Sequence, residues 1–280
     1  MPEELRRPAT ATERADVRGM HESNRLAWNA AAERYTAELD ETIAFIREGG
    51  INLDPPEREH LGDLRGRCRR AIHLQCASGR DTLSLWNLGA AEVVGLDISE
   101  RHIDNAQRLA AAVGAPARFV CADVLDAPHD LDDTADVVYT GKGALWWLHD
   151  LSSWAAVVAR LLAPGGRLYV FESHPVLWLF DDQGADTWRW SRLDYFDAVE
   201  ASQGWPSVYL TGLPPPERQP TKFAHLWRLG ELVTAVADAG LRIERLAEHR
   251  DEFCDMFGNI PEPDRWKVPR TFSLLASRPR

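Results

Sequence analysis

Short apolar runs alternate with helical stretches between Arg70 and Glu172, and this alternation limits the possible folds more than any other feature. The runs read as strands buried on both faces, at 71–76, 92–97, 117–122, 135–140 and 167–172. Helical patterns lie between them, at 81–88, 100–113 and 152–162. Ser99 is a suitable N-cap and Gly114 a suitable stop for the second helix. Strands and helices at this spacing form right-handed βαβ units, so we expect an α/β, Rossmann-like, doubly wound sheet that is mostly parallel.

Composition narrows the class of protein. The chain has 280 residues, a hydrophobic fraction of 45% and a formal net charge of −11. This length suits one large α/β domain with a well-buried core, or one domain plus a cap. A nucleic-acid partner is not expected, because phosphate binding needs a basic face. A membrane partner is not expected either, because no apolar run approaches the roughly 18 residues that a span needs.

The cysteines and the N-terminal segment bear on location. Four cysteines are scattered without a CxxC pair, so we expect no zinc ribbon, no bound metal and no disulfide framework. A reducing cytoplasm is the default for such a chain. Residues 1–20 carry charges of both signs and no apolar core, which predicts a disordered tail and not a signal peptide. A homodimer is left open.

The chain divides into five predicted segments. A helical pattern begins at His21 and continues to about Arg47, whereas residues 173–225 are rich in aromatics and prolines. A structureless loop of that length is improbable in a compact domain unless it is functional. The predicted segments are a tail (1–20), an N-terminal helical lid (21–66), a cofactor-binding core (67–172), an aromatic-rich cap insertion (173–225) and a C-terminal helix with strands that complete the core (226–280).

Small and acidic residues stand where the predicted strands end. In a doubly wound sheet, ligands bind outside the carboxyl ends of the strands, where the strand order reverses. The turn from Gln75 to Gly79 follows the first strand, and its small residues allow close approach of the backbone to a ligand. Asp97 ends the second strand and can accept hydrogen bonds from ribose hydroxyls, while Asp123 follows the third and can receive an adenine amino group.

These features resemble the class I S-adenosylmethionine (SAM)-dependent methyltransferases over about residues 70–172. The resemblance is carried by HLQCASGRD (73–81), VVGLDIS (93–99), CADVLD (121–126), DVVYTGKGALWWL (136–148) and LLAPGGRLYVFE (161–172). It implies SAM as cofactor and a seven-stranded sheet with an antiparallel last strand. The implied cofactor contacts are Tyr35, His73, Gln75, Ala77, Gly79, Asp97, Ile98, Asp123, Val124 and Thr140.

The first motif departs from the family pattern of an acid followed by three alternate glycines. Those positions hold His73, Gln75, Ala77 and Gly79, and we expect Gln75 to replace a close backbone approach with a side-chain contact. Two other classes stay open. Asp97 alone would also suit an NAD-binding Rossmann oxidoreductase, although the turn lacks GxGxxG. A scaffold that binds SAM without turnover is the second.

Catalytic candidates follow the fifth strand or lie near the cap. His174 is the first candidate for a general base, because histidine can take a proton near neutral pH. A loop histidine bonded to backbone is the alternative reading. Glu172 could orient His174 or bind an acceptor amine, and Tyr195 and His225 are weaker candidates.

Aromatic residues indicate where the acceptor binds and what kind of molecule it is. Trp28, Lys142, Trp146, Trp178 and Tyr209 are expected to border it, since indoles stack on flat rings and attract cations; tryptophans can equally serve to hold an irregular cap together. We predict methyl transfer to a small-molecule acceptor, an aromatic or amine-bearing natural-product intermediate methylated on nitrogen or carbon, with an indole-like acceptor as one option. O-methylation of a phenol or sugar hydroxyl is the alternative.

Overall fold

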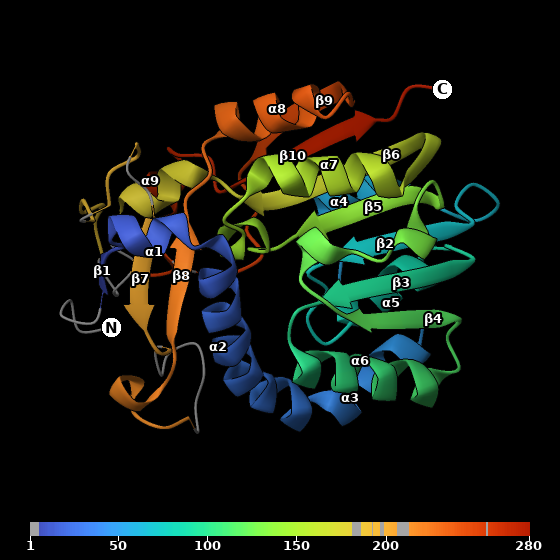
Figure 1. Cartoon of the computed structure of the whole chain (residues 1–280), viewed down its shortest axis with the longest axis horizontal. Coiled ribbons are helices and arrows are strands. Elements are labelled where there is room, and N and C mark those ends of the chain that lie inside the picture. Colours follow the sequence, from blue (N-terminus) through green and yellow to red (C-terminus); the bar gives the residue numbers. More distant parts are fainter. Residues whose placement is uncertain (1–5, 181–185, 192, 197–198, 206–212, 256) are drawn as a thin grey trace.

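The computed structural model describes residues 6–180, 186–191, 193–196, 199–205, 213–255 and 257–280. Within these residues, two sheets lie on opposite sides of one long helix (Figure 1). The large sheet has the spatial order β4 (Ala117–Cys121), β3 (Glu92–Asp97), β2 (Arg70–Leu74), β5 (Ala135–Gly141), β6 (Leu162–Ser173), β10 (Thr271–Ser277) and β9 (Arg242–His249). The small sheet has the order β1 (Arg6–Pro8), β7 (Val199–Gln203) and β8 (Thr221–His225).

The large sheet confirms the predicted architecture. Its strands β2 to β6 pair in parallel, and β10 pairs antiparallel with both β6 and β9. The chain moves outward from β2 to β4 in one direction and from β5 to β6 in the other. The strand order therefore reverses between β2 and β5, and ligands bind at such a reversal in doubly wound sheets.

Helices cover both faces of the large sheet. They are α3 (Leu39–Arg47), α4 (Pro55–Leu61), α5 (Arg80–Asn87), α6 (Glu100–Val113), α7 (Leu151–Leu161) and α8 (Leu229–Asp238). One apolar cluster joins Ile72, Leu74 and Val170 to Trp154 of α7 and Val236 of α8. A second cluster joins the opposite face of the same strands to α3, α5 and α6. This two-sided burial explains why the strand segments are almost continuously apolar.

Local signals set the ends of α6. The Ser99 hydroxyl accepts a hydrogen bond from the His102 backbone N–H, and Gly114 ends the helix with a left-handed φ of 68°. Both ends lie where the sequence predicts them, because each rests on a single local residue preference.

The N-terminal segment differs from the predicted disordered tail. The structure places β1, α1 (Ala11–Ala15) and the start of α2 (Val17–Ala37) within it; residues 1–5 lie outside the described part. The charges of both signs pair with one another: Glu13 forms a capping box with Thr10 and an ion pair with Arg7, and β1 hydrogen-bonds to β7. The single helix expected from His21 to Arg47 is two helices, α2 and α3, separated at Glu38.

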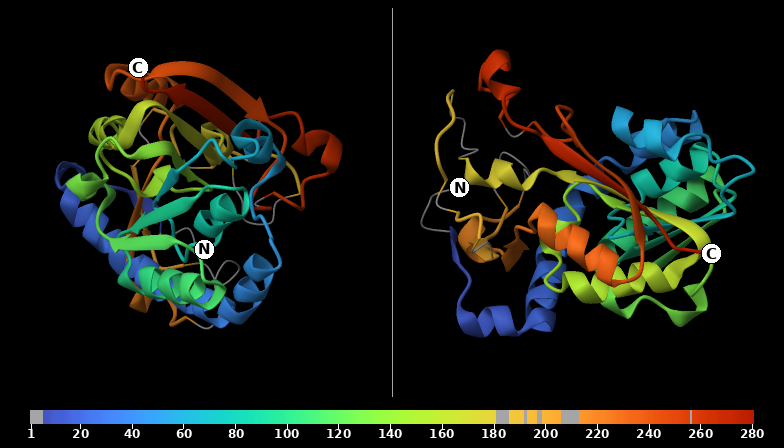
Figure 2. Two further views of the ribbon diagram at one scale, coloured as in Figure 1. Left: turned by 90° about the vertical axis from the view of Figure 1, so that its right-hand side faces the viewer. Right: turned by 90° about the horizontal axis from the view of Figure 1, so that it is seen from above.

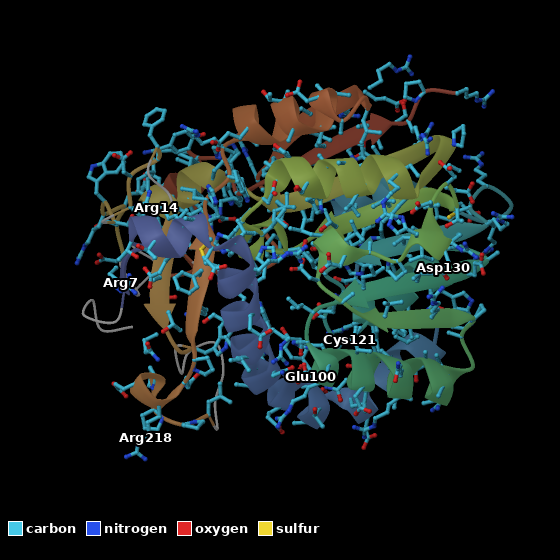
Figure 3. The ribbon with its side chains drawn as sticks, viewed as in Figure 1. Arg7, Arg14, Glu100, Cys121, Asp130 and Arg218 are labelled. Atoms are coloured by element: carbon cyan, nitrogen blue, oxygen red, sulfur yellow. The ribbon has the colours of Figure 1, made fainter. Side chains whose placement is uncertain are left out.

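The long helix α2 separates the two sheets. It packs against β8 on one side and α6 on the other, and two further views show it bridging the small sheet and the core (Figure 2). Arg25 of α2 pairs with Glu100 at the start of α6, where Figure 3 shows Glu100 beside α2. Among the described residues, no helix is long and apolar enough to cross a membrane.

Candidate active site

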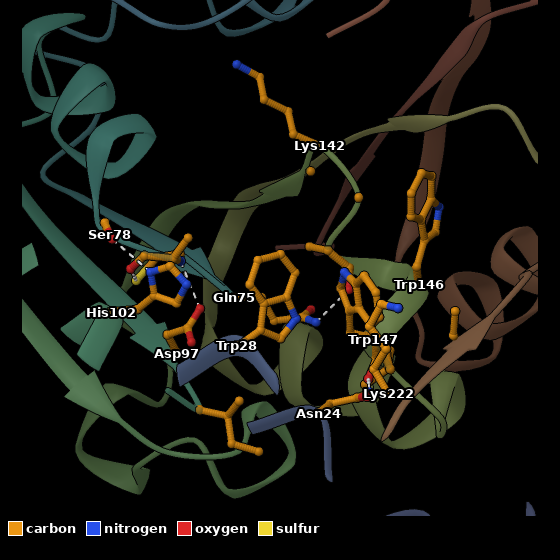
Figure 4. A pocket seen from close by; sticks show the side chains of 18 of the residues that line it. Asn24, Trp28, Gln75, Ser78, Asp97, His102, Lys142, Trp146, Trp147 and Lys222 are labelled. Carbon is orange, nitrogen blue, oxygen red and sulfur yellow. Dashed lines mark hydrogen bonds between the residues drawn. The ribbon is translucent and has the colours of Figure 1, made fainter. Parts of the chain in front are cut away.

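A cavity of about 550 Å³ lies at the carboxyl ends of the parallel strands, under α2 and the small sheet (Figure 4). Its walls include the turn after β2, the ends of β3 and β4, the loop after β5, one side of α2 and the inner face of β7 and β8. Cofactor candidates and cap residues therefore border one continuous space. The cavity coincides with the reversal of strand order between β2 and β5.

The turn after β2 has the backbone conformation of a glycine-rich turn, although two of its three glycine positions hold other residues. Gln75, Ala77 and Gly79 all have left-handed φ values, of 58°, 44° and 81°. These are the three positions where the family has glycines. A Cβ added to Gly79 would lie 2.9 Å from Ala106 Cβ, so glycine is required there for space as well as for backbone.

Gln75 bridges the turn to the loop after β5. Its Nε2 donates a hydrogen bond to the Ala144 carbonyl at 2.7 Å. Its Oε1 is buried and has no hydrogen-bond partner among the described residues. A buried acceptor without a partner costs free energy unless a ligand donates to it, and both Gln75 and Ala144 line the cavity.

Asp97 holds the turn in place from the end of β3. Its Oδ2 accepts from the Ala77 backbone N–H at 2.8 Å, and its Oδ1 accepts from the Ser99 N–H at 2.9 Å. Burial raises the pKa of Asp97 to about 6, although hydrogen bonds from backbone amides oppose the rise. A carboxylate has about four lone-pair positions, so Asp97 still has acceptor capacity toward the cavity that it lines.

Asp123 is bound by the N-terminal helix. Its Oδ2 lies 2.6 Å from Arg18 Nη1 and 2.7 Å from His21 Nδ1, and its Oδ1 accepts from the Leu125 N–H. Burial alone would raise the pKa of Asp123, but the hydrogen bond from His21 and the charge of Arg18 outweigh it, so the pKa lies below its ordinary value. Much of the capacity of this carboxylate is therefore used to dock α2.

The remaining cofactor candidates divide between the cavity wall and the layer behind it. Those that line the cavity are Tyr35, His73, Ile98 and Val124. Gly79 and Thr140 are not among the described lining residues: Gly79 is the N-cap of α5, and the Thr140 hydroxyl donates to the Leu74 carbonyl at 3.4 Å. His102, which sequence reasoning missed, also lines the cavity, between the rings of Tyr35 and Trp28.

Lys142 points away from the tryptophans (Figure 4). Its Nζ lies 3.3 Å from Asp54 Oδ2, 3.4 Å from Glu57 Oε2 and 3.6 Å from Asp81 Oδ2. Burial alone would lower the pKa of Lys142, but these three carboxylates raise it, so the side chain is charged. Lys142 lines the cavity, yet its ammonium group ties the loop after β5 to the start of α4 and to α5.

Glu172 supports the same loop from behind. Its Oε2 accepts from the Gly143 N–H at 2.7 Å and its Oε1 from the Leu145 N–H at 2.9 Å. Burial raises the pKa of Glu172 to about 7, although the backbone amides oppose the rise. The side chain does not line the main cavity; it fixes the loop that carries Trp146 and Trp147.

The predicted base His174 also lies outside the wall of the main cavity. Its Nε2 lies 2.8 Å from Glu248 Oε1 at the end of β9, and its Nδ1 accepts from the Val176 N–H. Of the other two catalytic candidates, His225 lines the cavity and stacks on Trp227 at 3.5 Å between ring centroids. Tyr195 packs against Phe196 and is not among the lining residues that the structure describes.

Tryptophans form two groups at the cap end of the cavity. Trp28, Trp147 and Trp205 contact one another with centroids 4.6–5.5 Å apart, and Trp146 meets Trp178 edge-on at 4.1 Å. All five line the cavity. Trp188 and Trp190 instead pack on Phe180, away from it. Tyr209 lies outside the described residues.

Known proteins are similar to this chain in the segment that borders the cavity. A family model described as a methyltransferase domain matches residues 71–166, the segment that carries the turn after β2, Asp97, Asp123 and the loop after β5. The matched segment is the one whose motifs resemble the class I SAM-dependent methyltransferases, and it is similar to the methyltransferase domain of that family. An O-methyltransferase of Penicillium expansum is 28% identical to it over 153 residues, which cover 53% of this chain and 51% of that protein. The chain thus spans about half the length of this curated relative.

Solved methyltransferase structures share the fold. An S-adenosylmethionine-dependent methyltransferase from Mesorhizobium loti superposes with a TM-score of 0.56 at 24% identity, covering 80% of this chain and 96% of that one. Geranyl diphosphate C-methyltransferase from Streptomyces coelicolor A3(2), solved with S-adenosyl-L-homocysteine, gives 0.53 at 15% identity, covering 79% and 76%. At these identities the likeness concerns the fold.

SAM is the cofactor of this methyltransferase family, and the residues present fit it. The left-handed turn brings the backbone close to the cavity, and Asp97 has acceptor capacity there. The buried Gln75 Oε1 has no donor among the described residues, so it could accept a hydrogen bond from the cofactor. SAM offers ribose hydroxyls and an α-ammonium group as donors to such acceptors. Among the described residues, no cluster of histidine, cysteine or carboxylate side chains could hold a metal ion.

Proposed function

We propose that this methyltransferase transfers the methyl group of SAM to a small-molecule acceptor, an aromatic or amine-bearing natural-product intermediate methylated on nitrogen or carbon. One observation carries the proposal: a single cavity joins Ala77, Asp97 and Asp123 at the strand ends to five tryptophans at the cap end. A catalyst of methyl transfer needs both binding sites in one enclosed space. Residues of α2, β7 and β8 line the cavity opposite the large sheet, in the segments that we propose as a lid (21–66) and a cap insertion (173–225).

Alignment is the main task of the protein. SAM supplies a methyl group on a sulfonium, which is already a good leaving group. The turn from Gln75 to Gly79 and Asp97 would hold the cofactor, with Tyr35, Ile98 and Val124 beside it. The tryptophans would orient a flat acceptor and exclude water. Such orientation corresponds to effective molarities of about 10⁵–10⁸ M.

A proton leaves the acceptor during or after attack, and His225 is the candidate to take it. His225 lines the cap end of the cavity, and burial lowers its pKa to about 4, so the imidazole is neutral at pH 7. His174 would act only indirectly, through the segment that follows β6. In this proposal His225→Ala lowers kcat more than His174→Ala, and neither changes SAM affinity; the reverse order would return His174 to the role of base.

The experiment that tests the function measures cofactor binding and turnover separately. Thermal shift with SAM, S-adenosylhomocysteine and NADH identifies the cofactor class; a larger shift with NADH would indicate an oxidoreductase. Mass spectrometry of an acceptor panel incubated with SAM then tests transfer. Binding of both SAM and S-adenosylhomocysteine with no methylated product across indoles, amines, phenols and sugars would favour a scaffold.

O-methylation is the second candidate, and the name of the Penicillium expansum relative favours it. A phenol or sugar hydroxyl would lie in the same tryptophan-lined space. A phenol must lose its proton for efficient attack, so O-methylation predicts a steeper dependence on base than ring methylation does. The site of the added methyl group, determined by NMR of the product, separates the two.

A further inference from the structure

The small sheet turns its polar face inward, toward the cavity. Side chains alternate between the two faces of a strand, and Glu200 and Ser202 of β7 line the cavity together with Lys222 and Ala224 of β8. Ser202 is the direct cross-strand neighbour of Lys222, and Glu200 of Ala224. The opposite face is apolar: Val199, Ala201 and Phe223 pack with Ala9 and Met20 in a separate cluster.

The inward polar residues are deeply buried. The exposed fraction is 7% for Glu200, 5% for Ser202 and 5% for Lys222. Burial of charge costs free energy unless other groups compensate it, so a sheet that merely closed the cap would present its apolar face inward. The reversed arrangement indicates that the cavity takes a ligand with a polar or charged group at this wall.

The lysine of this wall is held by the sheet itself. Lys222 Nζ donates to Ser202 Oγ at 2.7 Å and to the Gly204 carbonyl at 2.5 Å, and lies 5.1 Å from the ring centroid of Trp205. These contacts direct its donors back toward the protein. The Glu200 carboxylate, in contrast, is acceptor-only and has about four lone-pair positions, so it can bind a donor of the ligand in addition to neighbours in the protein.

The aromatic lining of the cavity also favours a ligand with a positive charge. The face of an indole is electronegative and attracts cations, most strongly where water is excluded. Trp28, Trp147 and Trp205 lie at the same end of the cavity as Lys222, and Figure 4 shows Lys222 beneath Trp147 with Asn24 beside it. A cavity lined both by the buried carboxylate of Glu200 and by a group of indoles is a suitable environment for an organic ammonium ion.

We propose that the acceptor carries a protonated amine beside an aromatic ring, and that Glu200 binds this ammonium while the tryptophans hold the ring. The inference rests on the proposed function, because it names the chemical class of the acceptor for the same cavity. A protonated nitrogen has no lone pair, so the ammonium serves recognition and the methyl group goes to a different atom of the acceptor.

Matched indoles that differ only in the charge of the side chain test this. Binding of tryptamine (cation), tryptophol (neutral) and indole-3-propionate (anion) is measured by calorimetry on the full chain saturated with S-adenosylhomocysteine. We expect tryptamine to bind at least about tenfold more tightly than tryptophol. Glu200→Gln should remove that preference and leave tryptophol affinity within about twofold, whereas Glu41→Gln on the exposed face of α3 should change neither.

The outcomes separate this inference from the proposed function. Equal affinity of tryptamine and tryptophol, a preference for the anion, or no binding of any indole would overturn the role of Glu200 while cofactor binding stands. Loss of S-adenosylhomocysteine binding by the unmodified chain would instead overturn the methyltransferase proposal. Unchanged affinity of Glu200→Gln for S-adenosylhomocysteine shows that the variant is folded, so its tryptamine affinity can be interpreted.

Discussion

The His21 imidazole joins the N-terminal helix to Asp123 at the end of β4, with 2.7 Å between Nδ1 and Oδ2. The His149 backbone N–H donates to Nε2 of the same ring at 3.1 Å, so Nε2 is the acceptor and Nδ1 carries the proton given to Asp123. One buried side chain thus connects α2, a strand end of the core and the segment just before α7. We infer that it keeps α2 closed over the cavity.

His21→Ala should loosen α2. Loss of a hydrogen bond to a carboxylate, with a partner left unsatisfied, costs about 1.5–3 kcal/mol of unfolding free energy. Hydrogen exchange in residues 17–37 should accelerate. Because the pKa of Asp123 is lowered in the folded state, its contribution is present above the ordinary value of 3.8 and is lost as pH falls through the lower folded value. The difference in free energy of unfolding between His21→Ala and the wild type should therefore become smaller in acid.

His129→Ala is the matched control for this prediction. His129 pairs with Asp132 on the surface, and its side chain is 86% exposed. Such pairs contribute about 0–1 kcal/mol. Equal destabilisation by the two alanine variants would contradict a special role of His21.

Asp97→Asn should weaken SAM binding at least about tenfold, because charge-assisted hydrogen bonds contribute about 1.5–3 kcal/mol each. The amide must also present an NH₂ group to one of the two backbone N–H donors, those of Ala77 and Ser99, which disturbs the turn. Titration with S-adenosylhomocysteine measures the effect. Asp104→Asn, in an exposed position on α6, serves as control and should leave the dissociation constant unchanged. Wild-type affinity in Asp97→Asn would remove this carboxylate from the cofactor site.

The large sheet, and the lining of the cavity by residues at its strand ends, could be predicted from the sequence because each signal is local. A buried strand followed by an acid, as at Asp97, or by small residues, as at Ala77, fixes both the element and its end. The lack of glycine at Gln75 and Ala77 gave no indication that the backbone stays left-handed there. That conformation depends on the hydrogen bond from Ala77 to Asp97, which is 20 residues away.

The wall of the cavity proposed to face the acceptor could not be predicted from the sequence in the same way, because it depends on tertiary pairing. His174 follows the fifth predicted strand, which placed it near the site. In the structure β10 pairs with β6 up to Ser173, and the imidazole lies beside Glu248 of β9. Glu200 and Lys222 alternate with apolar neighbours in sequence, but the face that borders the cavity is set by tertiary packing, since Ala9 and Met20 cover the apolar face of the small sheet.

Glu172→Gln should change both stability and its pH dependence. An amide at this position presents an NH₂ group to one of the two N–H donors, those of Gly143 and Leu145, at a cost of about 1–3 kcal/mol. The folded pKa of Glu172, about 7, lies above the ordinary 4.5, so ionisation opposes folding. Its favourable contribution is fully present below pH 4.5 and is lost as pH rises toward 7. The variant should lack this decline, as measured by urea unfolding from pH 4 to 8.

The left-handed turn allows a gain in stability from a single substitution. Ala77 has a φ of 44°, a conformation that costs a residue with a side chain about 1–2 kcal/mol. Glycine adopts it freely but loses about 0.5–1 kcal/mol more backbone entropy on folding. Ala77→Gly should therefore raise the free energy of unfolding by up to about 1 kcal/mol in urea denaturation. Ala111→Gly, exposed in the right-handed helix α6, should lower it by about the same amount. If both variants were destabilised equally, the turn would not be left-handed at Ala77, and the equivalence of this position to a family glycine would be lost.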